Sequence, residues 1–165
     1  MKYICQCCGE EKEDWPAIAY SSPHPYMNLS DEELENSEIT SDICIIRYSD
    51  ETCYFIRVVL VQEVNESCQD LEYGVWVSLS KKSFNEYVEN YDNKDFETVY
   101  FGWLCNNFPD YDFEDSIPTN VEVNNKVGRP FIFPHESHEH PFVHDFYNGI
   151  SKEEAERRIK LVINW

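Results

Sequence analysis

The stretch ICIIRYSDETCYFIRVVLV, residues 43–61, contains two runs of β-branched and aromatic residues separated by a short polar segment. Such residues favour strands, and the polar residues 49–51 are suited to a turn. Ile43–Tyr48 and Thr52–Val61 are therefore predicted to form a β-hairpin. Farther along the chain, apolar residues alternate with other residues in Tyr73–Leu79, which predicts a third strand of the same sheet.

Helix signals flank this strand-rich region on both sides. Ser30 followed by Glu33 has capping-box spacing and predicts a short acidic helix, and Ser80 or Ser83 can cap a helix that runs to about Tyr91. Ser151 and Glu154 have the same spacing ahead of an amphipathic C-terminal helix. Further strands are expected at Glu97–Leu104, near Val121–Val123 and near Phe131–Phe133. The predicted fold class is α+β, with a mainly antiparallel sheet, a middle helix and a C-terminal amphipathic helix.

The 165 residues fit one domain, residues 1–165, and 42% of them are apolar. Within this domain we expect a short first strand, a Cys-containing turn at residues 5–9 and an irregular Pro-containing segment at residues 13–29. The sequence contains no apolar run of the roughly 20 residues that a membrane span needs, and no signal-peptide pattern. We therefore expect a cytoplasmic protein.

Charge is the most distinctive feature of the composition. Thirty-two acidic and 13 basic residues give a formal net charge of −19. Such a chain repels phosphate backbones and anionic lipid surfaces, which argues against direct nucleic-acid or membrane binding. Residues 13–46 and 95–125 contain acids and no Lys or Arg. These clusters form either a solvated surface or a face that attracts a basic protein partner.

The acids are densest in two places, which are the candidate partner-binding residues. Tyr111 and Phe113 lie between acids of the second group, and an aromatic ring with a charged surround is typical of an interface anchor. The alternative is that both rings fold inward. The candidate residues are Asp31, Glu32, Glu33 and Glu35 in the first group, and Asp110, Tyr111, Asp112, Phe113, Glu114 and Asp115 in the second.

Cys5-x-x-Cys8-Gly9 has the spacing of half a zinc site, so Cys5 and Cys8 are the candidate metal ligands and zinc the candidate cofactor. A structural zinc site needs two more ligands, and no second pair stands at a standard distance. The alternative is a reduced turn without metal. The seven cysteines are odd in number, and in a chain without a secretory signal thiols or metal ligands are more plausible than a disulfide framework.

The His-containing segment PHESHEHP, residues 134–141, has metal-binding residue types without helical spacing, and its prolines oppose a helix. We expect a polar loop there. The chain also lacks a nucleophile elbow and a Gly-rich phosphate loop. An enzyme is possible on these grounds without being indicated.

A series of short motifs resembles the bacterial family called domain of unknown function 2199, over nearly the whole chain. The tryptophan-containing strings are its specific part, and the resemblance implies one small bacterial domain without supplying an activity. The motifs are Cys5-x-x-Cys8-Gly9, Thr40–Cys44, Gly74–Ser80, Tyr100–Leu104 with Asn106, Arg129-Pro130, His140-Pro141 and Gly149–Ser151.

Two functional hypotheses follow. The first is a non-enzymatic acidic interaction protein, most concretely an immunity-type inhibitor that binds a basic toxin or another basic protein. The alternative is a small-molecule or metal-dependent enzyme with a polar cleft near Asp42, Asn106, Arg129 and His140. A deep pocket that joins these four residues would favour the enzyme, and a flat acidic face would favour the interaction protein.

Overall fold

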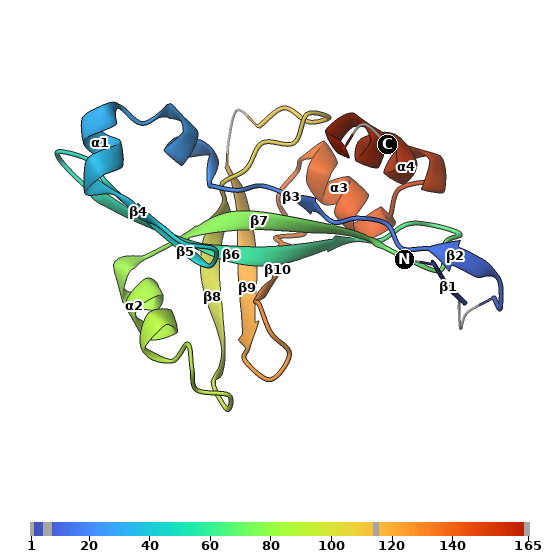
Figure 1. The fold of residues 1–165 in the computed structure, drawn as a ribbon, viewed down its shortest axis with the longest axis horizontal. Coiled ribbons are helices and arrows are strands. Elements are labelled where there is room, and N and C mark those ends of the chain that lie inside the picture. The colour runs from blue at the N-terminus through green and yellow to red at the C-terminus, as the bar shows by residue number, and fades with distance from the viewer. Residues whose placement is uncertain (1, 5–7, 114–115, 164–165) are drawn as a thin grey trace.

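The centre of the fold is a long hairpin made by β6 (Thr52–Gln62) and β7 (Leu71–Leu79). It is seen in a computed structural model, which describes residues 2–4, 8–113 and 116–163. The two strands pair antiparallel in continuous register, from Tyr54 opposite Leu79 to Gln62 opposite Leu71. Both strands run through the middle of the molecule (Figure 1).

Three further strands close this hairpin into a small barrel. β8 (Glu97–Leu104) pairs with β7, β9 (Ile117–Asn124) with β8, and β10 (Phe131–Pro134) with β9, all antiparallel. β10 then pairs in parallel with β6, which returns the sheet to its start.

Shorter strands extend the outside of the barrel. β5 (Ile43–Arg47) continues from β6 as the predicted hairpin, and β4 (Glu38–Ile39) pairs with β5. β3 (Ile18–Ala19) pairs in parallel with β7. A separate hairpin consists of β1 (Lys2–Ile4) and β2 (Glu11–Glu13).

The helices lie around the barrel (Figure 1). The helix α2 lies toward one end, and the helices α3 and α4 lie toward the other. The predicted capping box of α1 is confirmed, because the Ser30 hydroxyl accepts from the Glu33 N–H and the Glu33 carboxylate accepts from the Ser30 N–H. The bounds are η1 (His24–Asn28), α1 (Asp31–Asn36), α2 (Lys81–Glu89), α3 (Pro141–Asn148) and α4 (Lys152–Ile163).

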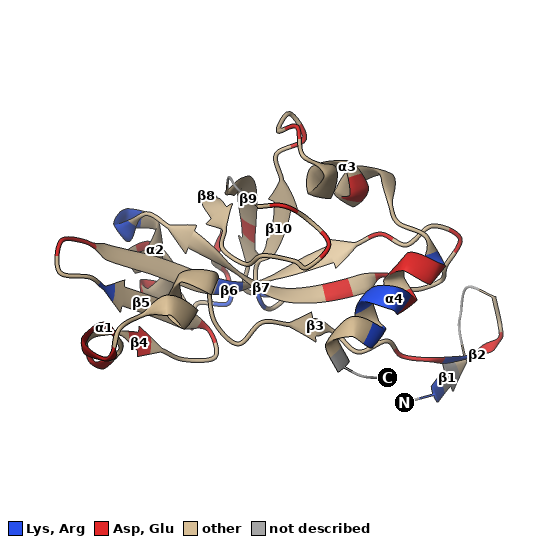
Figure 2. Cartoon of the chain, turned by 90° about the horizontal axis from the view of Figure 1, so that it is seen from above, with Lys and Arg blue, Asp and Glu red and all other residues tan. Residues whose placement is uncertain are grey.

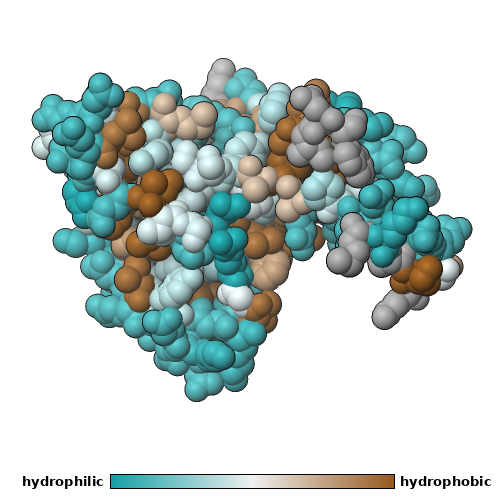
Figure 3. All heavy atoms as spheres, viewed as in Figure 1, coloured by the Kyte–Doolittle hydropathy of each residue, from teal (hydrophilic) through white to brown (hydrophobic). Residues whose placement is uncertain are grey.

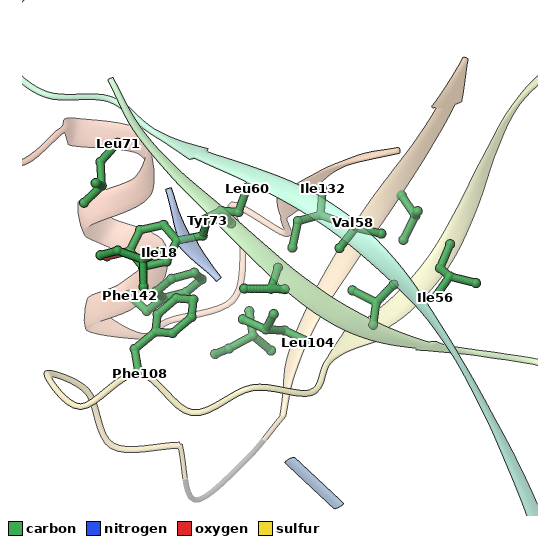
Figure 4. Packing of buried hydrophobic residues seen from close by; sticks show 14 of the residues in the cluster. Ile18, Ile56, Val58, Leu60, Leu71, Tyr73, Leu104, Phe108, Ile132 and Phe142 are labelled. Atoms are coloured by element: carbon green, nitrogen blue, oxygen red, sulfur yellow. The ribbon is translucent and has the colours of Figure 1, made fainter. Parts of the chain in front are cut away.

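The main core fills the barrel and includes residues of α2 at one end and of α3 and α4 at the other. Figure 4 shows the part of this core around Phe108 and Phe142. Alternate residues of β6, such as Ile56, Val58 and Leu60, point into it. A smaller core lies on the outer side of the sheet, where Phe55 and the fully buried Trp76 pack together. Gly102 on β8 permits a close approach, since a Cβ there would lie 3.0 Å from the Ser78 carbonyl oxygen.

The predicted α+β class and the mainly antiparallel sheet are confirmed, and two features go beyond the prediction. The sheet closes into a barrel through the parallel pair of β10 and β6, and β3 adds a second parallel pair, which local patterns do not reveal. The segment after residue 140 is helical, because Pro141 occupies the first turn of α3, where its missing N–H costs no hydrogen bond. None of the helices formed by the described residues combines the length and apolar composition needed to cross a membrane.

Asn106 ties the irregular segment before η1 to the barrel. Its side chain is 2% exposed, its Oδ1 accepts from the Trp76 N–H at 2.8 Å, and its Nδ2 donates to the Ser22 carbonyl at 2.9 Å. Asn106 therefore satisfies two buried backbone groups, which is a structural task.

We predict that Asn106→Leu lowers the free energy of unfolding by about 2 to 4 kcal/mol, because it leaves both backbone groups without this partner. Urea unfolding measures the change. The neighbouring Asn107 is exposed, so Asn107→Leu is the matched control and should shift stability by less than about 0.5 kcal/mol. Equal stability of the two variants would contradict the assignment.

Candidate functional site

Of the four residues of the predicted polar cleft, only Asp42 and Arg129 contact each other in the structure. Asp42 and Arg129 form an ion pair, in which Arg129 Nε lies 3.1 Å from Asp42 Oδ1. Asn106 is buried in its structural role. The Nδ1 of His140 accepts from the Phe142 N–H at the start of α3, so His140 caps that helix. The structure thus brings together two of the four residues.

The Asp42 carboxylate is the best-connected charged group of this set. Its Oδ2 accepts from the Tyr91 hydroxyl and from the Ser41 hydroxyl, each at 3.0 Å. Burial alone would raise the pKa of Asp42, but the hydrogen bonds from Tyr91, Arg129 and Ser41 outweigh it and hold the pKa below its ordinary value. Asp42 is consequently charged and fully engaged by its own chain.

The His-containing segment borders a hollow of about 490 Å³ at the start of α3. His135 lies instead 2.9 Å from Asn120 Oδ1 on β9. No group of three or more His, Cys, Asp or Glu among the described residues is arranged to hold a metal ion. The lining consists of Glu136, His138, Glu139, His140, Pro141, Val143, His144, Tyr147 and Asn148.

The predicted zinc ligands are only partly described. Cys5 lies outside the described residues, and Cys8 is exposed, with its Sγ 3.9 Å from a carboxylate oxygen of Glu10. Zinc at Cys5 and Cys8 stays a prediction.

The second acidic group is drawn into a network that anchors α4. Asp110 accepts from Arg157 Nη2 at 2.5 Å. The Tyr111 hydroxyl donates to Asp145 Oδ2 at 2.6 Å and accepts from Arg158 Nη2 at 2.5 Å. Arg158 is only 4% exposed and also donates to Glu154 on the preceding turn. Asp110 and Tyr111 therefore serve internal packing.

The remaining residues of that group divide between surface and interior. Phe113 is half-buried against the main core and stacks on the His140 ring, with centroids 5.3 Å apart. Asp112 is exposed, and its backbone carbonyl lies 2.5 Å from His140 Nε2. Glu114 and Asp115 lie outside the described residues. Of the two alternatives for Tyr111 and Phe113, the structure shows the inward arrangement.

The first acidic group is presented to solvent. The helix α1 buries none of its residues, and among the four candidates only Glu33 is partly covered, by its capping role. More acids lie close by at the β5–β6 turn, and Figure 2 shows both places in red. We call this set the acidic lobe: Asp31, Glu32, Glu33, Glu35, Glu38, Asp50 and Glu51. The neighbouring Arg47 is paired with Glu38 of the lobe at 2.6 Å.

The outer side of β8, β9 and β10 carries exposed aromatic residues in register. Phe101 on β8 lies opposite Asn120 on β9, which in turn lies opposite Phe133 on β10. Trp103 on β8 lies opposite Pro118 on β9. The rings of Phe101 and Trp103 meet edge to face at 5.0 Å. We call this set the aromatic face: Val99, Phe101, Trp103, Pro118, Asn120, Glu122, Phe131, Phe133 and His135.

The aromatic face is open to solvent to an unusual degree for such residues. Val99 is 59% exposed, Phe101 49% and Trp103 43%. In the space-filling view, brown apolar atoms interrupt the hydrophilic surface at several places (Figure 3). Clustered exposed apolar side chains on a sheet mark an interaction site more often than single ones do.

The sequence predicts the strand Glu97–Leu104, but this face was not identified from it. A signal was present, because the run Val-Tyr-Phe-Gly-Trp-Leu from residue 99 is apolar at every position. A strand with one side against the core and one side in water alternates apolar with polar residues. An uninterrupted apolar run therefore indicates that both sides are covered, or that one side awaits a partner.

The network around α4 generates a prediction on pH dependence. The hydrogen bond from Arg157 is the main cause that lowers the pKa of Glu154 from 4.5 to about 2. A carboxylate with a depressed folded-state pKa stabilises the fold fully above its unfolded value, and this contribution is lost as pH falls toward the folded value. We predict that Glu154→Gln lowers stability at pH 7, and that the gap from the parent chain closes between about pH 4.5 and 2.

Unfolding by urea at a series of pH values from 7 to 3 measures this gap. Glu153 is the matched control, because it is exposed and makes no ion pair with any described residue. Glu153→Gln should keep the parent pH profile. A stability gap for Glu154→Gln that stays constant down to pH 3 would show that its ionisation is not what stabilises α4.

Comparison with known proteins yields one match and supports the motif resemblance. No curated protein and no solved structure matches the chain. The model of the family described as "Uncharacterized protein conserved in bacteria (DUF2199)" matches residues 4–150, a range that includes the acidic lobe, the aromatic face and the whole barrel. The match covers well over half of the chain, which therefore belongs to this bacterial family.

Proposed function

We propose that this chain is a non-enzymatic binding domain for a basic protein partner. The observation that carries the proposal is the aromatic face, an open set of rings on β8–β10 of a protein whose net charge is −19. The face supplies contact area, and the acidic charge supplies long-range attraction.

The composition of the aromatic face fits a protein interface. Tyr, Trp and Phe are enriched at interfaces because rigid rings bury a large area at little cost in entropy. Between the two apolar columns of this face, β9 presents the polar side chains of Asn120 and Glu122. A Lys or Arg of the partner can lie over the ring of Phe101 and still reach Glu122, its diagonal neighbour on β9, which adds a cation–π contact to an ion pair.

The acidic lobe supports the same class of partner. The lobe consists of acidic residues, and the neighbouring Arg47 is already paired with one of them, Glu38. Opposite charge increases the rate of encounter between proteins, and salt weakens this effect. An inhibitor of immunity type, in which the basic partner is a toxin, is one concrete form of this proposal.

The enzyme alternative depends on a cleft that joins Asp42, Asn106, Arg129 and His140. Among these four described residues, only Asp42 and Arg129 contact each other, and Asn106 is buried away from solvent. This distribution favours the binding proposal over the enzyme alternative.

We predict that the double change Phe101→Ala and Trp103→Ala weakens binding of the partner about tenfold or more, because exposed aromatic anchors contribute most of the binding energy of an interface. The partner is first isolated as a basic bacterial protein retained by the parent chain at physiological salt. Its affinity for each variant is then measured by surface plasmon resonance.

The matched control removes exposed apolar surface elsewhere. Leu161 and Val162 on α4 are 58% and 47% exposed and lie outside the aromatic face, so changing both to Ala should leave the affinity unchanged. Melting curves verify that both double variants fold. Equal weakening by the two double variants, or by neither, counts against the aromatic face.

A second prediction concerns the acidic lobe. Changing Asp31, Glu32 and Glu35 to Asn, Gln and Gln should slow association with the same partner several-fold at low salt, because steering depends on exposed charge. Glu33 is left in place, since it caps α1. The difference should disappear at high salt.

The control for the lobe changes the net charge equally at another site. Glu136, Glu139 and Glu153 are exposed and lie outside the lobe, and all three are changed to Gln. If this control slows association as much as the lobe variant does, attraction comes from overall charge, and the lobe has no special part in binding.

A further inference from the structure

A second surface of the barrel gathers positive charge where two strands meet along β6. β5 begins at Ile43, opposite Ile56, and β10 begins at Phe131, opposite Val59. The two strands share one edge of β6 and run away from this point in opposite directions. Asp42 and Arg129 precede them, and Arg57 lies on β6 between the two.

The Arg57 guanidinium is held in place without a hydrogen bond from it to any residue that the structure describes. Its Cζ lies 5.8 Å from the centre of the Trp76 ring, which is fully buried and paired with Arg57 across the sheet. The guanidinium also passes over Gly74, where a Cβ atom would overlap its Nη2. Its Nε is buried and makes no hydrogen bond with any described residue. Buried donors of this kind are rare and call for an explanation.

The nearby carboxylate does not serve Arg57. The backbone N–H of Arg57 donates to the Asp42 carbonyl at 2.9 Å, which places the two residues side by side. Both carboxylate oxygens of Asp42 are nonetheless taken, one by Arg129 and the other by Tyr91 and Ser41. Burial, with the charge of Arg129, lowers the pKa of Arg57, as expected for two cations that share one anion.

Two guanidinium groups and one carboxylate leave a single positive charge in a strongly acidic protein. A guanidinium presents parallel N–H donors that match the two oxygens of a carboxylate. We propose that Arg57, supported by Arg129, binds the carboxylate of a small organic acid. The bound carboxylate accepts from the guanidinium of Arg57 and balances the excess charge. Arg129 lines a hollow together with Val99, Glu122 and Phe131, so this site borders the aromatic face, but it does not depend on the proposed partner.

The test uses sodium acetate as the probe, with nuclear magnetic resonance of the whole ¹⁵N-labelled chain. The Arg57 Nε–H signal is assigned by its loss in Arg57→Lys, which keeps the charge and much of the stem. We expect acetate to shift this signal saturably, whereas sodium chloride at equal ionic strength does not. In Arg57→Lys, acetate binding is followed at the signals of neighbouring backbone amides. It should weaken about tenfold, because the two parallel N–H donors of the guanidinium are lost.

Two further variants distinguish the loss of a binding group from damage to the fold. Asp42→Asn removes the competing carboxylate, and it should tighten acetate binding several-fold by freeing Arg129. Arg47→Lys is the matched control, because Arg47 is exposed and paired with Glu38, and it should leave binding unchanged.

Three outcomes of the titrations, and one outcome of the Asp42→Asn variant, would overturn the proposal. The first is no saturable shift at Arg57 with acetate, and the second is an equal shift with chloride. The third is a response to inorganic phosphate without a response to acetate, which would exclude a carboxylate as the ligand. Weaker binding in Asp42→Asn would also contradict the proposed balance of charge.

Discussion

The continuous pairing of β6 with β7 is the constraint on which the other elements depend. It fixes which residues of both strands face the barrel interior, because side chains alternate and a slip of one residue would turn the whole set outward. Ile56 and Val58 enter the main core, and Arg57 between them must face outward. On its other edge, β6 pairs with the barrel strand β10 and the outer strand β5. In the same way, β7 pairs with the barrel strand β8 and the outer strand β3. The aromatic face and Arg57 lie along these edges or on the strands attached to them.

The aromatic face follows from the same alternation on β8. Tyr100 and Leu104 belong to the interior, and Gly102 allows the strand to approach β7 closely. Phe101 and Trp103 consequently have no place in the core, and no described element covers them fully. Their exposure reflects strand geometry rather than loose packing, which makes a partner surface the simplest physical reason for rings at these positions.

Local features of this fold could be predicted from sequence, and long-range ones could not. The strand Glu97–Leu104 and the cap formed by Ser30 and Glu33 follow from neighbouring residues, and both are confirmed. Barrel closure rests on the pairing of Phe131 with Val59, 72 positions apart in the sequence, which no local pattern specifies. The inward direction of Tyr111 likewise depends on Arg158, a residue of a distant helix. The acids of α1 were found because charge density is local, and the aromatic face was missed because its outward direction is set by the barrel.

The arginines explain why so acidic a chain folds and still leaves an uncompensated surface. Of its five arginines, Arg47, Arg129, Arg157 and Arg158 each form ion pairs with carboxylates of the chain itself. These ion pairs place positive charge beside acidic residues that lie against the sheet or α4. The repulsion between carboxylates is therefore reduced where the chain packs closely. The acids of α1 receive no such partner from the described residues, apart from the contacts within their own cap. Negative charge is thus neutralised where the fold needs it and retained where solvent or another protein can reach it. Arg57 is the exception, because it is placed on Trp76 without a carboxylate, and this makes it the one arginine of the chain with binding capacity left for a ligand.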